Sequence, residues 1–143
     1  MKRKLYLVGL AISMTLVLLA GQAIAQNSEI FMCTVPFAFH AGPVKMPAGQ
    51  YIVKIPSSQK GLICLESVKS AHTAMLLTSP FVQGKSPASA KLVFNRYGAT
   101  YFLTKVWSSV SASGQELMKS KAEKEFVQQA RIPETVDVAL SHR

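Results

Sequence analysis

The sequence predicts an all-β fold: a β-sandwich or flattened barrel of about six to eight antiparallel strands with one C-terminal helix. Two observations carry this prediction. Apolar and polar residues alternate over most of the chain beyond residue 29, and turn residues recur at short intervals. One stretch, about residues 120–131, has helical spacing instead.

The first 25 residues have the organisation of a secretory signal peptide. Residues 2–4 are basic, residues 5–20 carry no charge, and residues 23–25 read Ala-Ile-Ala, the small-x-small pattern that a signal peptidase cleaves. The same run is long enough for an uncleaved membrane anchor, but Gly21 and Gln22 interrupt it and favour cleavage. We therefore expect a periplasmic or secreted protein that keeps no stable membrane span after cleavage.

The chain is basic, with 16 Lys and Arg against 7 Asp and Glu and a net charge of +9 at pH 7. After removal of the signal with its three basic residues, the net charge of the remaining chain is about +6. Export argues against nucleic acid as a partner and points to envelope polyanions. The alternative is that scattered lysines only keep the protein soluble, and it is favoured because basic residues beyond the signal are dispersed.

The first half of the predicted domain contains several short strands. Residues 30–40 place five apolar residues on one side, and Pro36 within that run indicates an edge strand or a bulge. Residues 41–50 must turn, because they contain two Pro and two Gly. Further strands are predicted at 51–56, 62–67 and 72–79, followed by a loop over 80–90.

Residues 91–107 form the clearest unit, a hairpin that turns near Tyr97-Gly98-Ala99. Alternation gives it two faces. We assign the first to the core because it has the larger apolar groups at its centre. That face holds Leu92, Phe94, Arg96, Tyr101, Leu103, Lys105 and Trp107, and the other holds Lys91, Val93, Asn95, Tyr97, Thr100, Phe102, Thr104 and Val106.

The helix begins with a capping box, in which Ser120 accepts from the backbone N–H of Glu123 and Glu123 reaches back. A narrow apolar stripe that includes Phe126 predicts that the helix lies across the sheet as a lid. Pro133 ends the helix. We therefore expect one β-rich domain over residues 26–131 and a flexible tail over residues 132–143.

The two cysteines, Cys33 and Cys64, leave two possibilities open. An oxidising compartment would allow a disulfide that closes a loop of about 30 residues and contributes about 3 kcal/mol. Alternatively, both are buried thiols that act as small apolar groups. No Cys-x-x-Cys motif or Cys/His cluster is present in the sequence, so we expect no metal site and no cofactor.

Catalytic motifs are missing from the sequence. It contains no Gly-x-Ser-x-Gly, its three histidines (His40, His72 and His142) are isolated, and its acidic residues form no evident pair. The prediction is that the protein is not an enzyme.

Binding has more support than catalysis. Asn95, Tyr97, Thr100, Phe102 and Thr104 share one hairpin face of mixed aromatic and polar character, which is the kind of surface that holds sugars. The alternative is that the helix covers this face, with Phe126 on Phe102, and we favour it. A second candidate pair, Tyr51 and Trp107, is better explained as packing.

Several segments resemble a family of small exported proteins of acidobacteria-like soil bacteria. The resemblance rests on residues 35–39 (VPFAF), 47–51 (PAGQY), 92–98 (LVFNRYG), 101–103 (YFL) and Trp107. It covers about residues 30–128, implies export, and brings no catalytic residues. The two cysteines are not part of the shared pattern.

Together these features predict a non-catalytic exported module that binds an envelope component, such as a glycan. The alternative is a structural or assembly protein that pairs with another exported chain through an edge strand such as residues 30–40.

Overall fold

The structure is a computed structural model that describes residues 28–57, 59, 61–82, 87–108, 113–129 and 132–143. The predicted signal peptide, residues 1–25, lies outside the described residues. The strands are β1 (Ser28–Val35), β2 (Phe39–Ala41), β3 (Val44–Met46), β4 (Gly49–Pro56), β5 (Leu62–Ser67), β6 (Thr73–Val82), β7 (Lys91–Tyr97), β8 (Thr100–Trp107), β9 (Ser113–Leu117), β10 (Glu134–Ala139) and β11 (Ser141–His142). The helix α2 spans Lys121–Gln128 and lies between β9 and β10.

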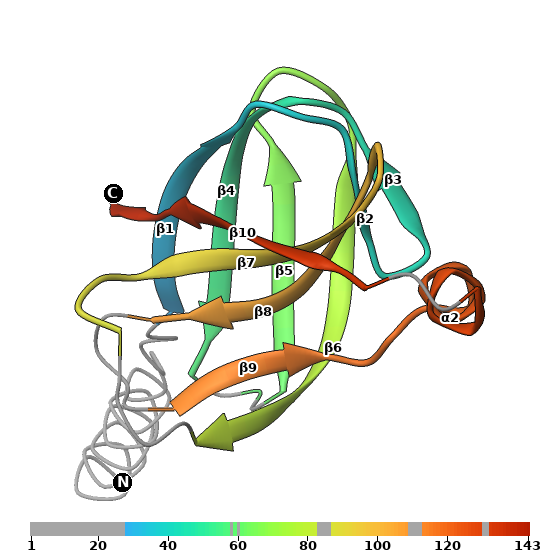
Figure 1. The fold of residues 1–143 in the computed structure, drawn as a ribbon. Helices are drawn as coiled ribbons and strands as arrows, with labels where there is room; N and C mark the ends of the chain where they lie inside the picture. The colour runs from blue at the N-terminus through green and yellow to red at the C-terminus, as the bar shows by residue number, and fades with distance from the viewer. Residues whose placement is uncertain (1–27, 58, 60, 83–86, 109–112, 130–131) are drawn as a thin grey trace, which may run out of the picture.

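The strands form two layers, as the sequence predicts for a sandwich (Figure 1). One layer contains β1, β4 and β5, the other contains β7, β8 and β9, and the strand order is β10-β7-β8-β9-β6-β5-β4-β1-β11. The long strand β6 belongs to both layers, because its first half pairs with β5 and its second half with β9. All pairings are antiparallel except a single parallel bridge between His40 and Phe102.

Two details of the predicted fold are corrected. The sheet has 11 strands, more than predicted, because β2, β3 and β11 are only two or three residues long and two strands lie beyond the helix. The flattened-barrel alternative is also wrong, since the path of paired strands ends at β10 on one side and at β11 on the other without closing.

The core lies between the layers and is filled by alternate residues of the strands, as period-two patterning requires. Pro36 comes directly after β1 and ends it, while the predicted apolar side of residues 30–40 faces inward. Aromatic rings join the layers: Phe39 lies 5.2 Å from Phe94 and 5.4 Å from Tyr51, between ring centroids. The largest fully buried side chains include Tyr51, Phe31, Phe39, Phe94, Met46, Ile63, Leu65 and Leu92.

The β7–β8 hairpin turns where predicted, with Gly98 at a φ of 64°, but a bulge changes which residues face the core. Leu92, Phe94 and Leu103 face inward as expected. The pairing then shifts between Val93 and Phe94, so Leu92 lies opposite Val106. Because one extra residue reverses the alternation, Val106 joins the main core cluster in place of Trp107 and Lys105. Trp107 is nevertheless buried, at 2% exposed, and packs against Phe81.

The tail predicted to be flexible, residues 132–143, instead contains two strands. β10 pairs along its whole length with β7, and β11 pairs with β1. Leu140, between them, is buried and donates its backbone N–H to the carbonyl of Ala90 at 2.9 Å. The final segment of the chain therefore contacts both layers of the sandwich.

The helix α2 begins as predicted but ends at Gln128, three residues before the expected boundary. Ser120 is the N-cap, and its side chain accepts from the backbone N–H of Glu123 at 3.2 Å. The Glu123 side chain does not complete the capping box by reaching back to the start of the helix. Its carboxylate is buried against the hairpin instead, as described next.

Candidate functional site

The hairpin face predicted to bind a glycan lies beneath α2. Phe126 of the helix lies 5.6 Å from Phe102 and 5.8 Å from Tyr97, measured between ring centroids. Phe102 also stacks on His40 at 4.9 Å. Both Tyr97 and Phe102 are 2% exposed, so the covering-helix alternative describes this face and the open binding surface does not.

The polar members of that face bind groups of the protein itself. Asn95 donates to Glu123 Oε1 at 3.2 Å and the Tyr97 hydroxyl donates to the same oxygen at 3.4 Å. Thr104 donates to the carbonyl of Val93 at 3.1 Å, and Thr100 is half-buried opposite Tyr97 at the hairpin turn. Burial and the neighbouring Glu123 carboxylate both raise the pKa of Tyr97, in that order. In this structure the polar groups of Asn95, Tyr97 and Thr104 are therefore engaged with other parts of the protein.

The second candidate pair, Tyr51 and Trp107, is also explained by packing. Tyr51 lies in the core and its hydroxyl donates to the carbonyl of Pro47. Trp107 packs edge-on against Phe81 at 4.8 Å. A Cβ at Gly114 would lie 2.6 Å from the Phe81 ring and 3.0 Å from Trp107, so glycine is required beside this pair.

The cysteines do not form a disulfide; both thiols are free. Cys33 is on β1 opposite Tyr51 and faces the core, whereas Cys64 is on β5 opposite Lys54 and faces outward. With β4 between them and opposite side-chain directions, the two sulfurs cannot meet without moving backbone. Cys33 therefore fits the buried-thiol alternative, while Cys64 lies on the outer surface, with its Sγ 3.7 Å from the Glu66 carboxylate.

Thiol labelling should distinguish the two cysteines. Burial raises the pKa of Cys33 to about 11, and burial and the neighbouring Glu66 also raise the pKa of Cys64. The two thiols therefore differ in access, because Cys33 is buried and Cys64 is half-buried on the outer surface. We expect a maleimide to modify the folded protein once, at Cys64, and the unfolded protein twice, with peptide mass spectrometry locating the label. Rapid labelling of Cys33 under native conditions would contradict the packing of β1.

A cluster of metal-ligating side chains is not found in the part of the chain that the structure describes. No group of three or more His, Cys, Asp and Glu there could hold a metal ion. The histidines are well separated: His40 stacks on Phe102, His72 contacts Ser70 at 3.0 Å, and His142 packs against Phe31.

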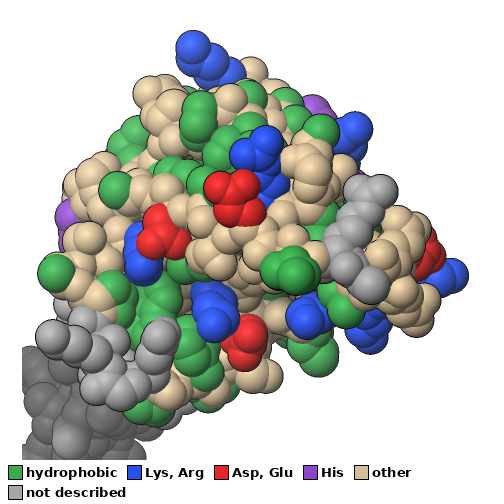
Figure 2. Space-filling view, viewed as in Figure 1, with side chains coloured by type: hydrophobic (Ala, Val, Ile, Leu, Met, Phe, Trp, Pro, Cys, Tyr) green, Lys and Arg blue, Asp and Glu red, His purple; other side chains and the backbone are tan. Residues whose placement is uncertain are grey.

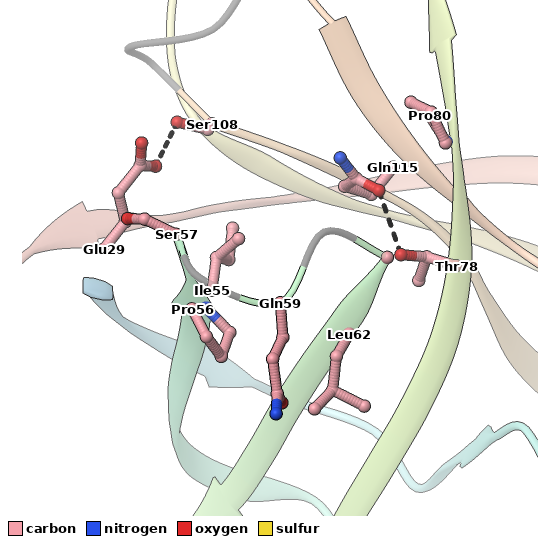
Figure 3. Close-up of a pocket in the computed structure, with 11 residues that line it drawn as sticks. Glu29, Ile55, Pro56, Ser57, Gln59, Leu62, Thr78, Pro80, Ser108 and Gln115 are labelled. Atoms are coloured by element: carbon pink, nitrogen blue, oxygen red, sulfur yellow. Dashed lines mark hydrogen bonds between the residues drawn. The ribbon is translucent and has the colours of Figure 1, made fainter. Parts of the chain in front are cut away.

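A cavity of about 580 Å³ opens at one end of the sandwich, and the sequence analysis did not identify it. Its lining comes from the start of β1, the end of β4, the turn after it and the start of β5, the second half of β6, the residue after β8 and the middle of β9 (Figure 3). The lining residues are Glu29, Ile55, Pro56, Ser57, Gln59, Gly61, Leu62, Thr78, Pro80, Ser108 and Gln115.

The polar side chains of this end cavity are already oriented by hydrogen bonds (Figure 3). Ser108 donates to the carboxylate of Glu29, across the gap between β8 and β1. Thr78 donates to Gln115 Oε1 at 3.0 Å, which leaves the amide Nε2 as a donor for a ligand. Ile55, Leu62 and two prolines supply apolar contact area beside these groups.

Sequence reasoning missed this site because its residues come from strand ends and turns that are far apart in the chain. The available signal was weak: hydroxyl or amide residues (Ser57, Gln59, Thr78, Ser108 and Gln115) stand at the ends of apolar segments. Only the pairing of β6 with β9 brings Thr78 and Gln115 together.

Comparison with known proteins adds no relative: no family model, no curated protein and no solved structure matches the chain. In the described segments, no helix has both the length and the apolar character needed to cross a membrane.

Proposed function

We propose that this protein is a non-catalytic exported module that holds a hydroxyl-rich envelope component, such as a glycan unit, in the end cavity. The observation that carries the proposal is the cavity of about 580 Å³ with oriented polar groups beside apolar ones. Pockets that bind small ligands typically measure about 300–1,000 Å³ and combine an apolar wall with a few fixed polar groups.

The cavity lining fits a sugar better than a lipid chain. Sugars present hydroxyl groups at their edges and C–H groups on their faces, so they need amide and carboxylate partners next to apolar surface. Gln115 and Glu29 supply the polar partners, and Ile55 and Leu62 supply the apolar surface. The signal-like N-terminus and the resemblance to exported proteins support the envelope as the place where the ligand is met.

The charge of the lining favours a neutral ligand or a cationic one. Among the described residues that line the cavity, Glu29 is the one with an ionisable side chain. A phosphorylated or uronic-acid ligand would bring its own negative charge close to the Glu29 carboxylate.

Ligand-dependent thermal stabilisation tests the proposal. A neutral glycan fragment that binds the native state should raise the melting temperature in a saturable way. Gln115→Ala removes the oriented amide and should weaken binding about tenfold, since a lost hydrogen bond leaves a partner unpaired. Gln128→Ala, at an exposed position of α2, is the matched control and should bind like the wild type.

Two outcomes would contradict the proposal. The first is an unchanged melting temperature across neutral, amino and acidic glycans at millimolar concentration. The second is binding that Gln115→Ala does not weaken, which would place the ligand outside the end cavity.

A structural or assembly role is the second candidate, but the strand chosen for it from the sequence is partly occupied. β1 pairs with β4 along its whole length on one side, and β11 pairs with Phe31 and Met32 on the other. Such short terminal strands protect an edge from pairing with another chain. An assembly role would therefore require a different surface.

A further inference from the structure

The outward side of β1, β4, β5 and β6 is unusually apolar. Register places its side chains in rows across the four strands: Ile30, Lys54, Cys64 and Met75 form one row, and Met32, Ile52, Glu66 and Thr73 form the next. Leu77 continues the β6 column after Met75. The apolar members of this set, which we call the outer apolar face, are Ile30, Met32, Ile52, Cys64, Met75 and Leu77.

Exposure separates the outer apolar face from ordinary sheet surface. Met75 and Leu77 are each 68% exposed. The outward side of an antiparallel sheet is normally polar when water covers it, and the other layer of this molecule follows that rule. There Lys91 contacts Asp137 at 2.6 Å, and Figure 2 shows Lys and Arg side chains beside Asp and Glu over β7–β10. A contiguous exposed apolar patch indicates an interaction surface.

The charges on the outer apolar face are few and balanced. In the two rows of residues the charged members are Lys54 and Glu66, whose Nζ and Oε2 lie 2.7 Å apart. The hydrogen bond from Lys54 holds the pKa of Glu66 below its usual range, so this carboxyl group is ionised at neutral pH. The face is therefore neutral, although the whole chain carries a net charge of +9.

We propose that the outer apolar face joins two copies of this chain in a symmetric, sheet-on-sheet dimer. The pattern is self-complementary, which an interface with twofold symmetry requires. The twofold axis would lie in the plane between the two sheets and pass midway between Lys54 and Glu66. Each Lys54 would then lie against Glu66 of the partner subunit. The apolar members then cover one another. Two positively charged copies would repel each other elsewhere, but not through this neutral face.

The size of the face sets the expected strength of the dimer. Four strands spaced about 4.8 Å apart, with about six residues each, give a footprint on the order of 350 Å² per copy. Specific interfaces usually bury more, about 800 Å² per partner. We therefore expect a weak, reversible dimer. None of its members lines the end cavity, although Leu77 lies directly opposite the lining residue Leu62.

Sedimentation velocity across a concentration series, on protein purified from cells that express the full chain, measures this equilibrium. The wild type should shift from monomer to dimer as concentration rises. Met75→Lys combined with Leu77→Lys should remain monomeric, because it places lysines in the apolar centre of the contact. The matched control, Val82→Lys combined with Ile132→Lys, changes residues that are 82% and 93% exposed elsewhere and should dimerise like a wild-type protein.

A charge-swap series tests the symmetric arrangement itself. Lys54→Glu and Glu66→Lys should each weaken the dimer at least about tenfold, since like charges then face each other across the axis. The double variant K54E/E66K restores opposite charges and should recover dimerisation to within about threefold of the wild type. Thermal melts show whether each variant is folded.

Three results would overturn the proposal. One is a wild-type protein that stays monomeric up to millimolar concentration, whether or not it binds lipid vesicles through the outer apolar face instead. Another is a dimer that persists in the Met75/Leu77 lysine variant. The third is a double charge swap that folds but does not recover dimerisation.

Discussion

Deleting residues 134–143 is expected to abolish the cooperative unfolding transition of this protein at room temperature. β10 supplies the only strand that pairs with β7 on its outer edge among the described residues, and Val136 and Val138 pack against the core. Leu140 is 9% exposed. Burying apolar side chains of this size contributes about 1.5–3 kcal/mol each, and a whole domain is stable by only about 5–15 kcal/mol. Circular dichroism with a denaturant titration measures the effect.

Removing Arg143 alone is the control for this deletion, because the last residue is exposed and lies beyond β11. Its melting temperature should stay within a few degrees of the wild-type value. If the ten-residue deletion also unfolded cooperatively near the wild-type temperature, the two terminal strands would not contribute to the fold, and the original prediction of a flexible tail would be correct.

Phe102→Ala is expected to destabilise the protein by about 3–5 kcal/mol, the usual cost of deleting a buried aromatic ring. The ring contacts Tyr97, Phe126 and His40 at centroid distances between 4.9 and 5.8 Å, so its loss leaves a cavity between the hairpin and α2. The melting temperature should fall by at least about 10 °C.

Thr100→Ala is the matched control, since Thr100 belongs to the same predicted face but is only half-buried at the turn. It should change the stability by less than about 1 kcal/mol. If Phe102→Ala kept wild-type stability but lost glycan binding, the prediction that Phe102 serves packing would be wrong. That result would show that α2 leaves the hairpin in solution and that the aromatic face binds ligand.

Much of the fold was predictable because side-chain alternation is a local property of a strand. The run from Phe31 to Phe39 shows which side is buried without any knowledge of its neighbours. The capping role of Ser120 is equally local. The tail also carried a signal, since Val136 and Val138 alternate with polar residues, but six residues with two apolar positions gave too little pattern to distinguish a strand from a loop.

The candidate site could not be predicted in the same way. The end cavity combines Glu29 with Ser108 and Thr78 with Gln115, pairs that are separated by 79 and 37 positions in the sequence. Neither pair follows from spacing or composition. Their proximity depends on which strands become neighbours and on where each strand ends.

The sequence by itself determined the class of fold, most strand positions and the helix start, because these depend on residues within a few positions of one another. Only the tertiary structure decided which faces of those elements are buried and which strands become neighbours. A single bulge exchanged Trp107 for Val106 in the main core cluster, α2 buried Tyr97 and Phe102, and β4 separated Cys33 from Cys64. The physical reason is that burial of a given face depends on what packs against it, and that partner is set by long-range pairing, which local patterns do not encode.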